Sequence, residues 1–498
     1  MNFAVRPWAV TAVLSLLALS PAAGHAGMTP DEVKNFEGHK AKAEKGDRVA
    51  QNLLGACYAS GEGVSQDSVQ AISWWRKAAD QDFADAQCNL GFCYQLGIGA
   101  ERDYAQAVSW WRKAADQGFA LAQDSLGICF IKGEGVAKDP AQAASWWRKA
   151  ADQGHAPAQY NLGLCFYRGE GLMKDHLQAV SCWRSATQQQ HAAAQFYLGV
   201  CYGNGEGVAK DPVQAASWYR KAAEQGYALA QFYLAICYYN GEGVAKDLVQ
   251  AVSWYRKAAE QGNAPAQFNL GVCCENGDGV AKDHVQAASW YRKAADQGVA
   301  DAQFNLGVYY ASGLGLEKDF EQAVTWYRKA ADKGFAQAQF ILGVCSANGE
   351  GVAKELVQAV SWYRKAAEQG YAPAQFNLGV CYDNGEGVAK DPVQAVSWWR
   401  KAAEQGYADA QSNLGVAYHY GQGVIKNEIE AYAYYNLAGI TSEGARKNLA
   451  VLENEITSDA RLLGQQRTIQ LQKEIEGRLE TAQDLLDAIR KEKLREGI

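Results

Sequence analysis

The chain has little proline, little methionine and no dominant charge of either sign. Nine prolines and three methionines occur in 498 residues. Lysine and arginine together number 48, against 55 aspartates and glutamates, which gives a formal net charge of −7. A nucleic-acid surface needs a basic face of one sign, whereas here the basic residues recur beside acidic ones. The sequence therefore argues against nucleic acid as a partner.

Motifs of common catalytic and metal sites are also absent. No CxxC or HExxH occurs, so the usual zinc signatures are missing. SxxK, KTG and GxSxG are missing too, which removes sequence support for a serine acyl-transfer site. The recurrent loop GEGVAKD resembles a calcium loop only superficially, because it lacks the ligand spacing of an EF-hand. We expect no catalytic residue, no cofactor, no metal ligand and no enzyme activity.

Long apolar runs are missing except at the N-terminus. Residues 1–6 are basic, residues 8–19 are mostly apolar and residues 21–26 are small or helix-breaking, which is typical of a secretory signal peptide. The apolar run is too short to span a bilayer comfortably. No cysteine precedes Cys57, which excludes a lipid-modified cysteine at the cleavage point. The sequence predicts cleavage after Ala26 and an exported protein, periplasmic or secreted, that does not span the membrane.

What the chain does have is a strict 36-residue repeat. A GxG pair recurs eleven times, and its first glycines are Gly61, Gly97, Gly133, Gly169, Gly205, Gly241, Gly277, Gly313, Gly349, Gly385 and Gly421. A period of this length is typical of a solenoid, in which each copy buries its apolar face only by stacking on its neighbours. One elongated all-α domain, an α/α superhelical solenoid with the repeat array over residues 47–443, is the simplest interpretation.

Each copy reads as two helices, as residues 192–227 illustrate. Helix A has apolar residues at the spacing of four and three that places them on one face, and Gly205 ends it. Helix B begins after Asp211, whose carboxylate can accept from free backbone donors, with Pro212 at the first position and Gln214 at the capping-box position. This cap register is held by aspartate in nine copies, with Glu355 and Asn427 as departures.

Both ends of the array look capped by helices. Residues 27–46 form an N-terminal half-repeat, in which Asp31 lies in the cap register and Gly38 in the tryptophan position. Residues 444–498 form C-terminal capping helices, the last of them long, charged and capped by Ser458 or Asp459. Its apolar spacing lasts barely two heptads. We expect this helix to pack back on the array of a monomer, with dimerisation through it as the alternative.

These motifs resemble the Sel1-like repeat, a relative of the tetratricopeptide repeat. The resemblance rests on the LGxxY core, seen as Leu198-Gly199 through Tyr202, then GxGVxxD and AxxWYRKAAxQG, and it covers about residues 47 to 443. It implies an α/α superhelix that acts as an adaptor and holds peptide or protein partners on its inner surface. Exported bacterial members of the family include cysteine-rich secreted proteins and envelope or virulence scaffolds.

The cysteines depart from that cysteine-rich branch, which pairs a cysteine late in helix B with one early in the next helix A. Here those positions are alanine, and nine of the twelve cysteines share one register two residues after the LG glycine. Equivalent atoms on stacked helices lie roughly 10 Å apart, beyond the reach of a disulfide. We expect a ladder of small buried thiols. Pairings of Cys88, Cys182 and Cys274, which lie outside the ladder, stay open.

Helix A supplies the candidate binding residues. The position two residues before the LG leucine is mostly phenylalanine, and the position one residue before it is mostly asparagine. These two registers would form an apolar strip beside an amide strip, which could hold an extended peptide. Packing of the phenylalanines between adjacent helices is the competing interpretation. A third register varies between copies, which favours either partner specificity or freedom from packing. The candidates are Phe196, Phe232, Phe268, Phe304, Phe340, Phe376, Asn269, Asn305, Asn377, Tyr167, Tyr239, Glu275, Asp383 and His419.

Tandem aromatic residues in helix B support a second hypothesis. The pairs Trp74-Trp75, Trp110-Trp111, Trp146-Trp147 and Trp398-Trp399 could stack on sugars, which would make the chain a cell-envelope enzyme or enzyme accessory that binds glycan or peptidoglycan. Their position one turn from the recurrent alanines favours core packing instead. The sequence thus predicts a non-catalytic scaffold for protein or peptide partners, and exposed tryptophans would favour the glycan alternative.

Overall fold

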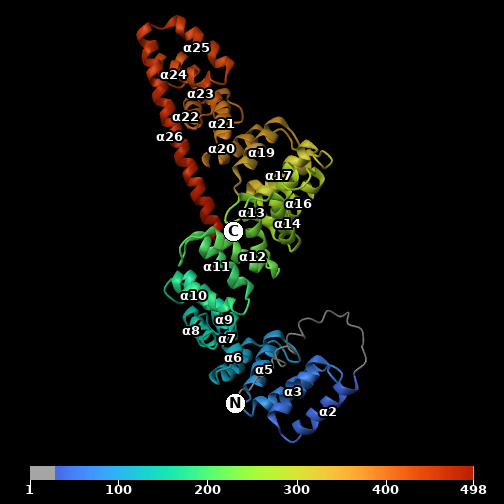
Figure 1. The fold of residues 1–498 in the computed structure, drawn as a ribbon. Helices are drawn as coiled ribbons and strands as arrows, with labels where there is room; N and C mark the ends of the chain where they lie inside the picture. The colour runs from blue at the N-terminus through green and yellow to red at the C-terminus, as the bar shows by residue number, and fades with distance from the viewer. Residues whose placement is uncertain (1–28, 497–498) are drawn as a thin grey trace. The chain divides into compact units, whose positions relative to one another are not determined.

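The computed structural model describes residues 29–496, with side chains up to residue 481, and the predicted signal peptide lies outside this part. Helices A and B alternate along the chain and each pair packs as one repeat, so the all-α repeat architecture is confirmed (Figure 1). The A helices are α3 (Arg48–Ser60), α5 (Ala84–Leu96), α7 (Ala120–Lys132), α9 (Ala156–Arg168), α11 (Ala192–Asn204), α13 (Ala228–Asn240), α15 (Ala264–Asn276), α17 (Ala300–Ser312), α19 (Ala336–Asn348), α21 (Ala372–Asn384) and α23 (Ala408–Tyr420). The B helices are α4 (Ser68–Ala79), α6 (Tyr104–Asp116), α8 (Pro140–Asp152), α10 (His176–Thr187), α12 (Pro212–Glu224), α14 (Leu248–Glu260), α16 (His284–Asp296), α18 (Phe320–Asp332), α20 (Leu356–Glu368), α22 (Pro392–Ala403) and α24 (Glu428–Ala438).

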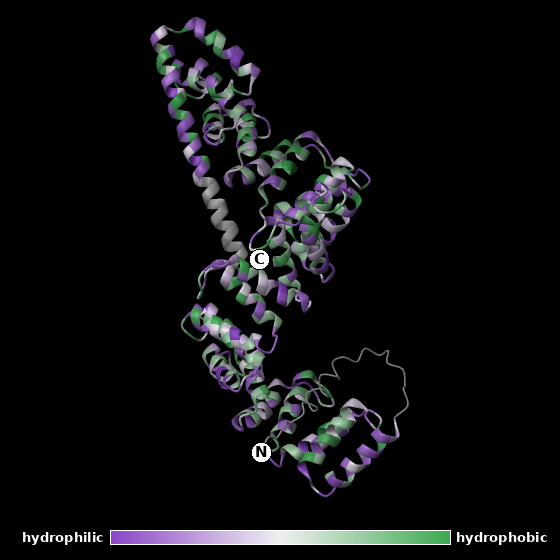
Figure 2. Ribbon diagram, viewed as in Figure 1, coloured by the Kyte–Doolittle hydropathy of each residue, from purple (hydrophilic) through white to green (hydrophobic). Residues whose placement is uncertain are grey.

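The chain divides into two compact units, Met1–Ala230 and Gln231–Ile498, and the boundary falls inside α13 rather than in a linker. The first unit begins with the capping helix α2 (Pro30–Ala43). The second ends with α25 (Glu443–Glu455) and α26 (Ser458–Glu496), and α26 packs on α24. The prediction that the C-terminal helix packs back on the array is therefore confirmed. Figure 2 shows apolar and polar residues interleaved along the helices, because each helix has one buried side.

Helix B begins where the aspartate register predicts. The Asp211 carboxylate accepts from the backbone N–H groups of Val213 and Gln214, both at 3.0 Å, so it satisfies donors that the first turn leaves free. Asn427 caps α24 in the same way, at 3.1 Å. Glu355 makes no such cap on α20, because its carboxylate is one methylene farther from the backbone.

Two predicted caps were wrong. Helix α2 is capped by Thr29, whose hydroxyl accepts from the Glu32 N–H while the Glu32 carboxylate accepts from the Thr29 N–H, so the helix starts before Asp31. Helix α26 is capped by Thr457, which accepts from the N–H of Ala460 at 3.2 Å, rather than by Ser458 or Asp459. In both cases a threonine hydroxyl immediately before the helix reaches the free donors first.

The two glycines of each GxG pair have different structural roles. Gly349 ends α19 in the left-handed conformation, with φ of 81°. Gly351 has φ of 68°, and a Cβ placed on it would lie 2.3 Å from the carbonyl oxygen of Phe320 at the start of the preceding helix B. The second glycine is therefore where one repeat contacts the backbone of the repeat before it.

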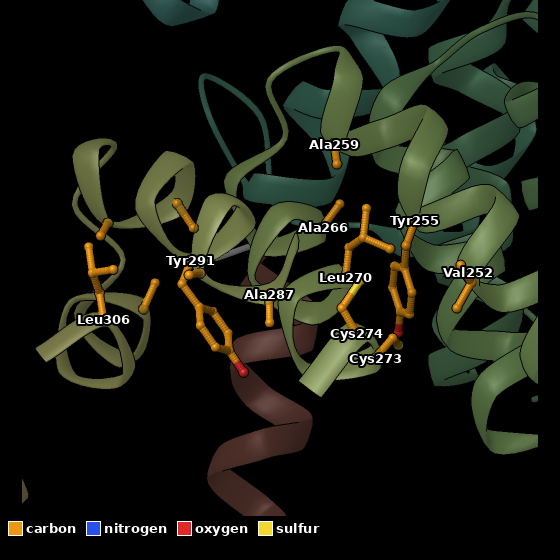
Figure 3. Packing of buried hydrophobic residues seen from close by; sticks show 14 of the residues in the cluster. Val252, Tyr255, Ala259, Ala266, Leu270, Cys273, Cys274, Ala287, Tyr291 and Leu306 are labelled. Carbon is orange, nitrogen blue, oxygen red and sulfur yellow. The ribbon is translucent and has the colours of Figure 1, made fainter. Parts of the chain in front are cut away.

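A third glycine lets the two helices of a repeat approach closely. A Cβ on Gly379 in α21 would lie 2.5 Å from the Trp399 ring of α22. The LG glycine makes room for the second aromatic residue of helix B in the same way in most repeats, and Ala235 is the one departure that still fits. Leu270, Cys273 and Tyr255 belong to one buried cluster of this kind (Figure 3).

The predicted cysteine ladder is confirmed as core. All twelve cysteines are free, Cys182 is half-buried and the rest are buried. Cys88 and Cys274, for which pairings stayed open, are unpaired as well. Burial raises the pKa of the Cys345 thiol to about 11, so the buried thiols remain protonated near neutral pH.

Candidate partner-binding surface

The phenylalanine register of helix A is only partly available to a partner. The ring centroid of Phe304 lies 5.7 Å from that of Tyr327 in its own helix B and 5.3 Å from that of Phe335 at the start of the next helix A. Phe340 makes the same two contacts, with Tyr363 and Tyr371. Packing between helices therefore accounts for these ring contacts. Half-buried rings are nevertheless left at the surface at Phe232, Phe268, Phe304, Phe340 and Phe376.

Phe196 is an exception within this register. It is only 4% exposed, and it contacts Tyr197, Tyr219 and Tyr227. A ring that is buried to this extent offers almost no area to a partner. The prediction that Phe196 contacts a partner directly is therefore corrected.

The asparagine register links neighbouring repeats. Asn269 forms a side-chain hydrogen bond with Tyr255 of the preceding helix B, and Asn305 does so with Tyr291. Asn377 bonds to Tyr363 in the same way. The amides predicted to bind a peptide backbone thus already have a structural partner. All three are half-buried, so each keeps part of its amide at the surface.

The third candidate register of helix A, which varies between copies, contains side chains that form hydrogen bonds within the array. The Tyr167 hydroxyl donates to the Glu206 carboxylate in the GxG loop of the next repeat at 2.8 Å, and Tyr239 donates to Asp278 of its next GxG loop at 3.0 Å. Tyr291 donates to Glu275 within one repeat. At these three positions the side chain that differs between copies is hydrogen-bonded within the array. Asp383 is half-buried on α21.

His419 lies inside the C-terminal end of the array. Its side chain is 3% exposed, and its Nε2 lies 2.8 Å from the Glu455 carboxylate of α25. The sequence placed it on the binding surface because it follows the helix A aromatic residue, but α25 covers that position after the last repeat. His419 is therefore a structural residue.

The predicted candidate Tyr167 belongs to an aromatic patch in the first unit whose other members, Tyr160 and Tyr197, were not among the candidates. Tyr160 of α9 stacks on His191 at 5.0 Å, and Tyr197 of α11 stacks on Trp183 at 5.0 Å. Tyr160 and Tyr197 lie 5.9 Å apart, and Tyr197 also contacts Tyr167. The three tyrosines are half-buried. The available signal was that Tyr160 interrupts the phenylalanine register and Tyr197 the asparagine register.

Asp124 lies beside this patch and is buried. It accepts from the Asn161 amide at 3.1 Å, and burial raises the pKa of its carboxyl group. The neighbouring His155 accepts from the Ala158 N–H through Nδ1 at 3.4 Å, and burial lowers the pKa of its imidazole. His155 is the N-cap of α9, and the attraction between its imidazole and the Asp124 carboxylate opposes part of both pKa shifts.

Comparison with known proteins identifies the repeats. The Sel1 repeat model matches residues 48–83, 84–119, 120–155, 156–191, 192–227, 228–263, 264–299, 300–335, 336–371, 372–407 and 408–439. The chain belongs to the Sel1 repeat family. Sel1 repeats generally mediate protein interactions, and proteins built from them are generally non-catalytic scaffolds.

Two solved structures are similar to this Sel1 repeat chain. One is a protective antigen of uropathogenic Escherichia coli strains that displays an SLR fold, with 38% identity, coverage of 90% of this chain and 97% of that chain, and a TM-score of 0.77. The other is a Sel1 repeat protein from Oxalobacter formigenes, with 32% identity, coverage of 63% and 93%, and a TM-score of 0.50. None of the curated proteins compared with the chain matched it.

The tryptophans of these Sel1 repeats are not free sugar platforms. Trp399, the second residue of its pair, is 6% exposed. Trp398, the first, is half-buried, and Lys401 Nζ lies 3.9 Å from its ring centroid. Other pairs follow the same pattern of one buried ring and one ring under a lysine. In the repeat of residues 156–191, the first tryptophan and the lysine over it are both replaced, by Cys182 and Ser185. The expectation that the tryptophans pack in the core is supported. The glycan hypothesis required exposed tryptophan rings, and these pairs do not provide them.

Groups of three or more histidine, cysteine, aspartate or glutamate side chains that could hold a metal ion do not occur among the described residues. Between residues 29 and 496, no helix has the length and apolar content that a membrane span requires.

Proposed function

We propose that this chain is an exported scaffold, without an active site of its own, that binds protein or peptide partners through the helix A side of its repeats. The observation that carries the proposal is the aromatic patch of Tyr160, Tyr167 and Tyr197 in the first unit. Tyrosine offers a large amphipathic contact area with few rotatable bonds, so it loses little conformational entropy on binding. The half-buried phenylalanines of α13 to α21 extend the same chemistry in the second unit.

The patch suits an extended peptide better than a small ligand. Tyr160 stacks on His191 and Tyr197 stacks on Trp183, and the three half-buried tyrosines contact one another side by side, so each keeps part of its ring at the surface. A peptide segment could lay apolar side chains on such rings, while half-buried amides such as Asn161 would bond to its backbone. Partner specificity would then come from the positions where Tyr160 and Tyr197 interrupt the regular registers.

Affinity capture tests the partner-binding surface. The chain without residues 1–26 is immobilised and exposed to the exported protein fraction of a bacterium that carries it. We expect specific partners to be retained by the parent and lost when Tyr160→Ser and Tyr197→Ser are combined. A matched control combines Val69→Ser and Val213→Ser, which lie on helix B and are 65% and 64% exposed. Equal retention by both variants would contradict the proposal.

Export is the second part of the proposal. It is supported by the basic, apolar and small-residue pattern of residues 1–26 and by the similarity to a protective antigen. Expression of the full chain in a bacterium, followed by fractionation and N-terminal sequencing, should give a periplasmic or secreted protein that begins at Gly27. An uncleaved cytoplasmic product would refute export and leave the scaffold role untouched.

A further inference from the structure

Paired glutamine side chains link the helices of most repeats. A buried glutamine near the start of helix A accepts, through its Oε1, a hydrogen bond from the Nε2 of a glutamine 30 residues later, in the turn after helix B. Its own Nε2 donates to the end of the preceding helix B, as Gln375 does to the Ala367 carbonyl at 3.1 Å. We call each pair a rung. Among the described residues, rungs with Nε2–Oε1 distances of 2.7–2.8 Å join Gln51 to Gln81, Gln87 to Gln117, Gln123 to Gln153, Gln195 to Gln225, Gln231 to Gln261, Gln267 to Gln297, Gln339 to Gln369 and Gln375 to Gln405.

Two repeats inside the array lack the rung. Lys333 stands at the position of the second glutamine, but its ammonium donates to the Gly298 carbonyl, and the Oε1 of Gln303 is left buried without a hydrogen-bond partner. Gln159 lacks a donor in the same way, because Gln189 also donates to a glycine carbonyl. Both oxygens are enclosed by the chain, so a partner has no access to them.

The last repeat leaves its rung open toward a cavity. Gln411 is 4% exposed and donates to the Ala403 carbonyl at 3.3 Å, but no group of the described residues donates to its Oε1. Thr441 stands 30 residues later, and its short side chain forms no such bond. Gln411 and Thr441 line a cavity of about 240 Å³ together with Gln472 of α26, whose Nε2 donates to Glu476 at 2.9 Å. A buried acceptor without a donor therefore faces an open space.

The cavity has the chemistry that a glutamine side chain requires. Leu437, Ile475 and Ala408 supply apolar walls for its two methylene groups. In a regular rung the donating amide also bonds a carbonyl of its own helix B, as Gln405 does with Lys401 at 3.3 Å. The residue equivalent to Lys401 in the last repeat is Leu437, which lines the cavity. Two acceptors thus stand where the two N–H groups of one primary amide are needed.

We propose that this cavity binds a glutamine side chain of a partner protein, which completes the missing rung at Gln411. The regular rungs identify the ligand, because the equivalent acceptor takes a glutamine Nε2 in each of them. Binding gives the buried Oε1 the donor that the chain itself does not provide. The inference rests on the proposed scaffold role for the source of the glutamine, but the site lies in the second unit and is separate from the aromatic patch of the first.

Saturation-transfer NMR on the full chain tests the site with small probes. The probes are glutamine, glutamate and methionine, each blocked as the N-acetyl methylamide, because their side chains have similar lengths. A side chain of about five heavy atoms should bind in the millimolar range, which suits this measurement. We expect saturable binding of the glutamine probe, at least about fivefold tighter than that of the other two, because only the amide donates to Gln411.

Three variants localise the binding. Thr441→Gln supplies the rung from the chain itself, so it should fill the cavity and abolish binding of the glutamine probe. Gln411→Met keeps the length of the side chain but removes the acceptor, so the glutamine probe should lose its advantage over the methionine probe. Gln339→Met is the matched control, because the Oε1 that it removes is already bonded by Gln369, and it should leave probe binding unchanged.

Several results would overturn the inference. No saturable binding would mean that water alone fills the cavity, and equal binding of the three probes would mean that the amide is not recognised. Unchanged binding by Gln411→Met would place the probe elsewhere, and this variant keeps the test valid if Thr441→Gln does not fold. Tighter binding of free glutamine than of the blocked probe would contradict a protein source. The Tyr160→Ser and Tyr197→Ser variant should still bind the glutamine probe, so failure of this site and failure of the helix A surface give different results.

Discussion

At the scale of single residues, glycine and aspartate have roles that depend on their neighbours. The sequence suggests that both glycines of GxG end a helix or shape a turn, yet Gly349 ends a helix while Gly351 lies against the backbone of the preceding repeat.

The asparagine, cysteine and aspartate of the first three repeats stand where later repeats have phenylalanine. Opposite them, a tryptophan replaces the tyrosine of helix B, at Trp75, Trp111 and Trp147.

The close contact of Gly351 predicts a large effect of a small substitution. Gly351→Ala should lower the free energy of unfolding by more than about 3 kcal/mol, because its Cβ would overlap the Phe320 carbonyl in addition to the strain of a positive φ. Gly370→Ala is the matched control. Gly370 also has a positive φ, of 90°, but nothing lies within 4 Å of its added Cβ, so it should lose only about 1–2 kcal/mol. Urea unfolding of the two variants checks this, and equal losses would contradict it.

The buried carboxyl group of Asp124 predicts how the stability of the fold changes with pH. Burial raises the pKa of its carboxyl group in the folded state, so its contribution to stability is fully present below the unfolded pKa and is lost as pH rises through the folded pKa. Asp124→Asn does not titrate, and Asn52 in the same register already bonds Asn89 at 3.2 Å. The variant should therefore gain thermal stability over the parent as pH rises from about 3 to 7. A constant difference in Tm across this range would contradict the expectation.

At the scale of helices, capping and close packing determine where each element begins and how it sits. Aspartate and asparagine cap the B helices, while Glu355 leaves the first turn of α20 without a side-chain cap. Helix α26 packs on α24 where Gly464 leaves room, since a Cβ there would lie 2.6 Å from the Tyr432 ring. The second unit thus ends in a long helix that covers its last B helix.

Leu471 should be the main apolar anchor of α26. It is buried with Val396, Leu414 and Leu437, whereas Leu479 is 48% exposed. Leu471→Ala should lower the stability of the docked helix by about 2–3 kcal/mol and increase amide exchange along α26. The matched Leu479→Ala should have little effect. Hydrogen exchange followed by mass spectrometry compares the two, and equal protection in both variants would mean that the anchor lies elsewhere.

At the scale of the whole chain, the repeat distributes its core over many small clusters rather than one large one. Three of these clusters each combine alanines with one leucine, one buried aromatic ring and one cysteine. Stability then depends on interfaces between neighbours, so local damage should propagate mainly to adjacent repeats. The buried ladder of thiols belongs to this arrangement.

The ladder predicts the reactivity of the reduced protein toward a thiol reagent. At pH 8 the native chain should react slowly, because its thiols are buried and their pKa values are raised, for instance to about 11 at Cys57 and Cys345. Half-buried Cys182 should react first, and Cys182→Ser should remove that phase. All twelve thiols should react in strong denaturant. Fast reaction of several thiols in the native chain would contradict the buried ladder.

The sequence by itself determined the repeat, its two helices, the aspartate caps, the cysteine core and the family, because each depends on local spacing that recurs eleven times. Only the tertiary structure decided which of the candidate side chains are buried and what each of them contacts. His419 and Phe196 are buried by contacts with neighbouring elements, and Tyr167 and Tyr239 bond to loops 39 residues ahead. A register shows which face of a helix a residue occupies, but exposure depends on what the next repeat places against that face.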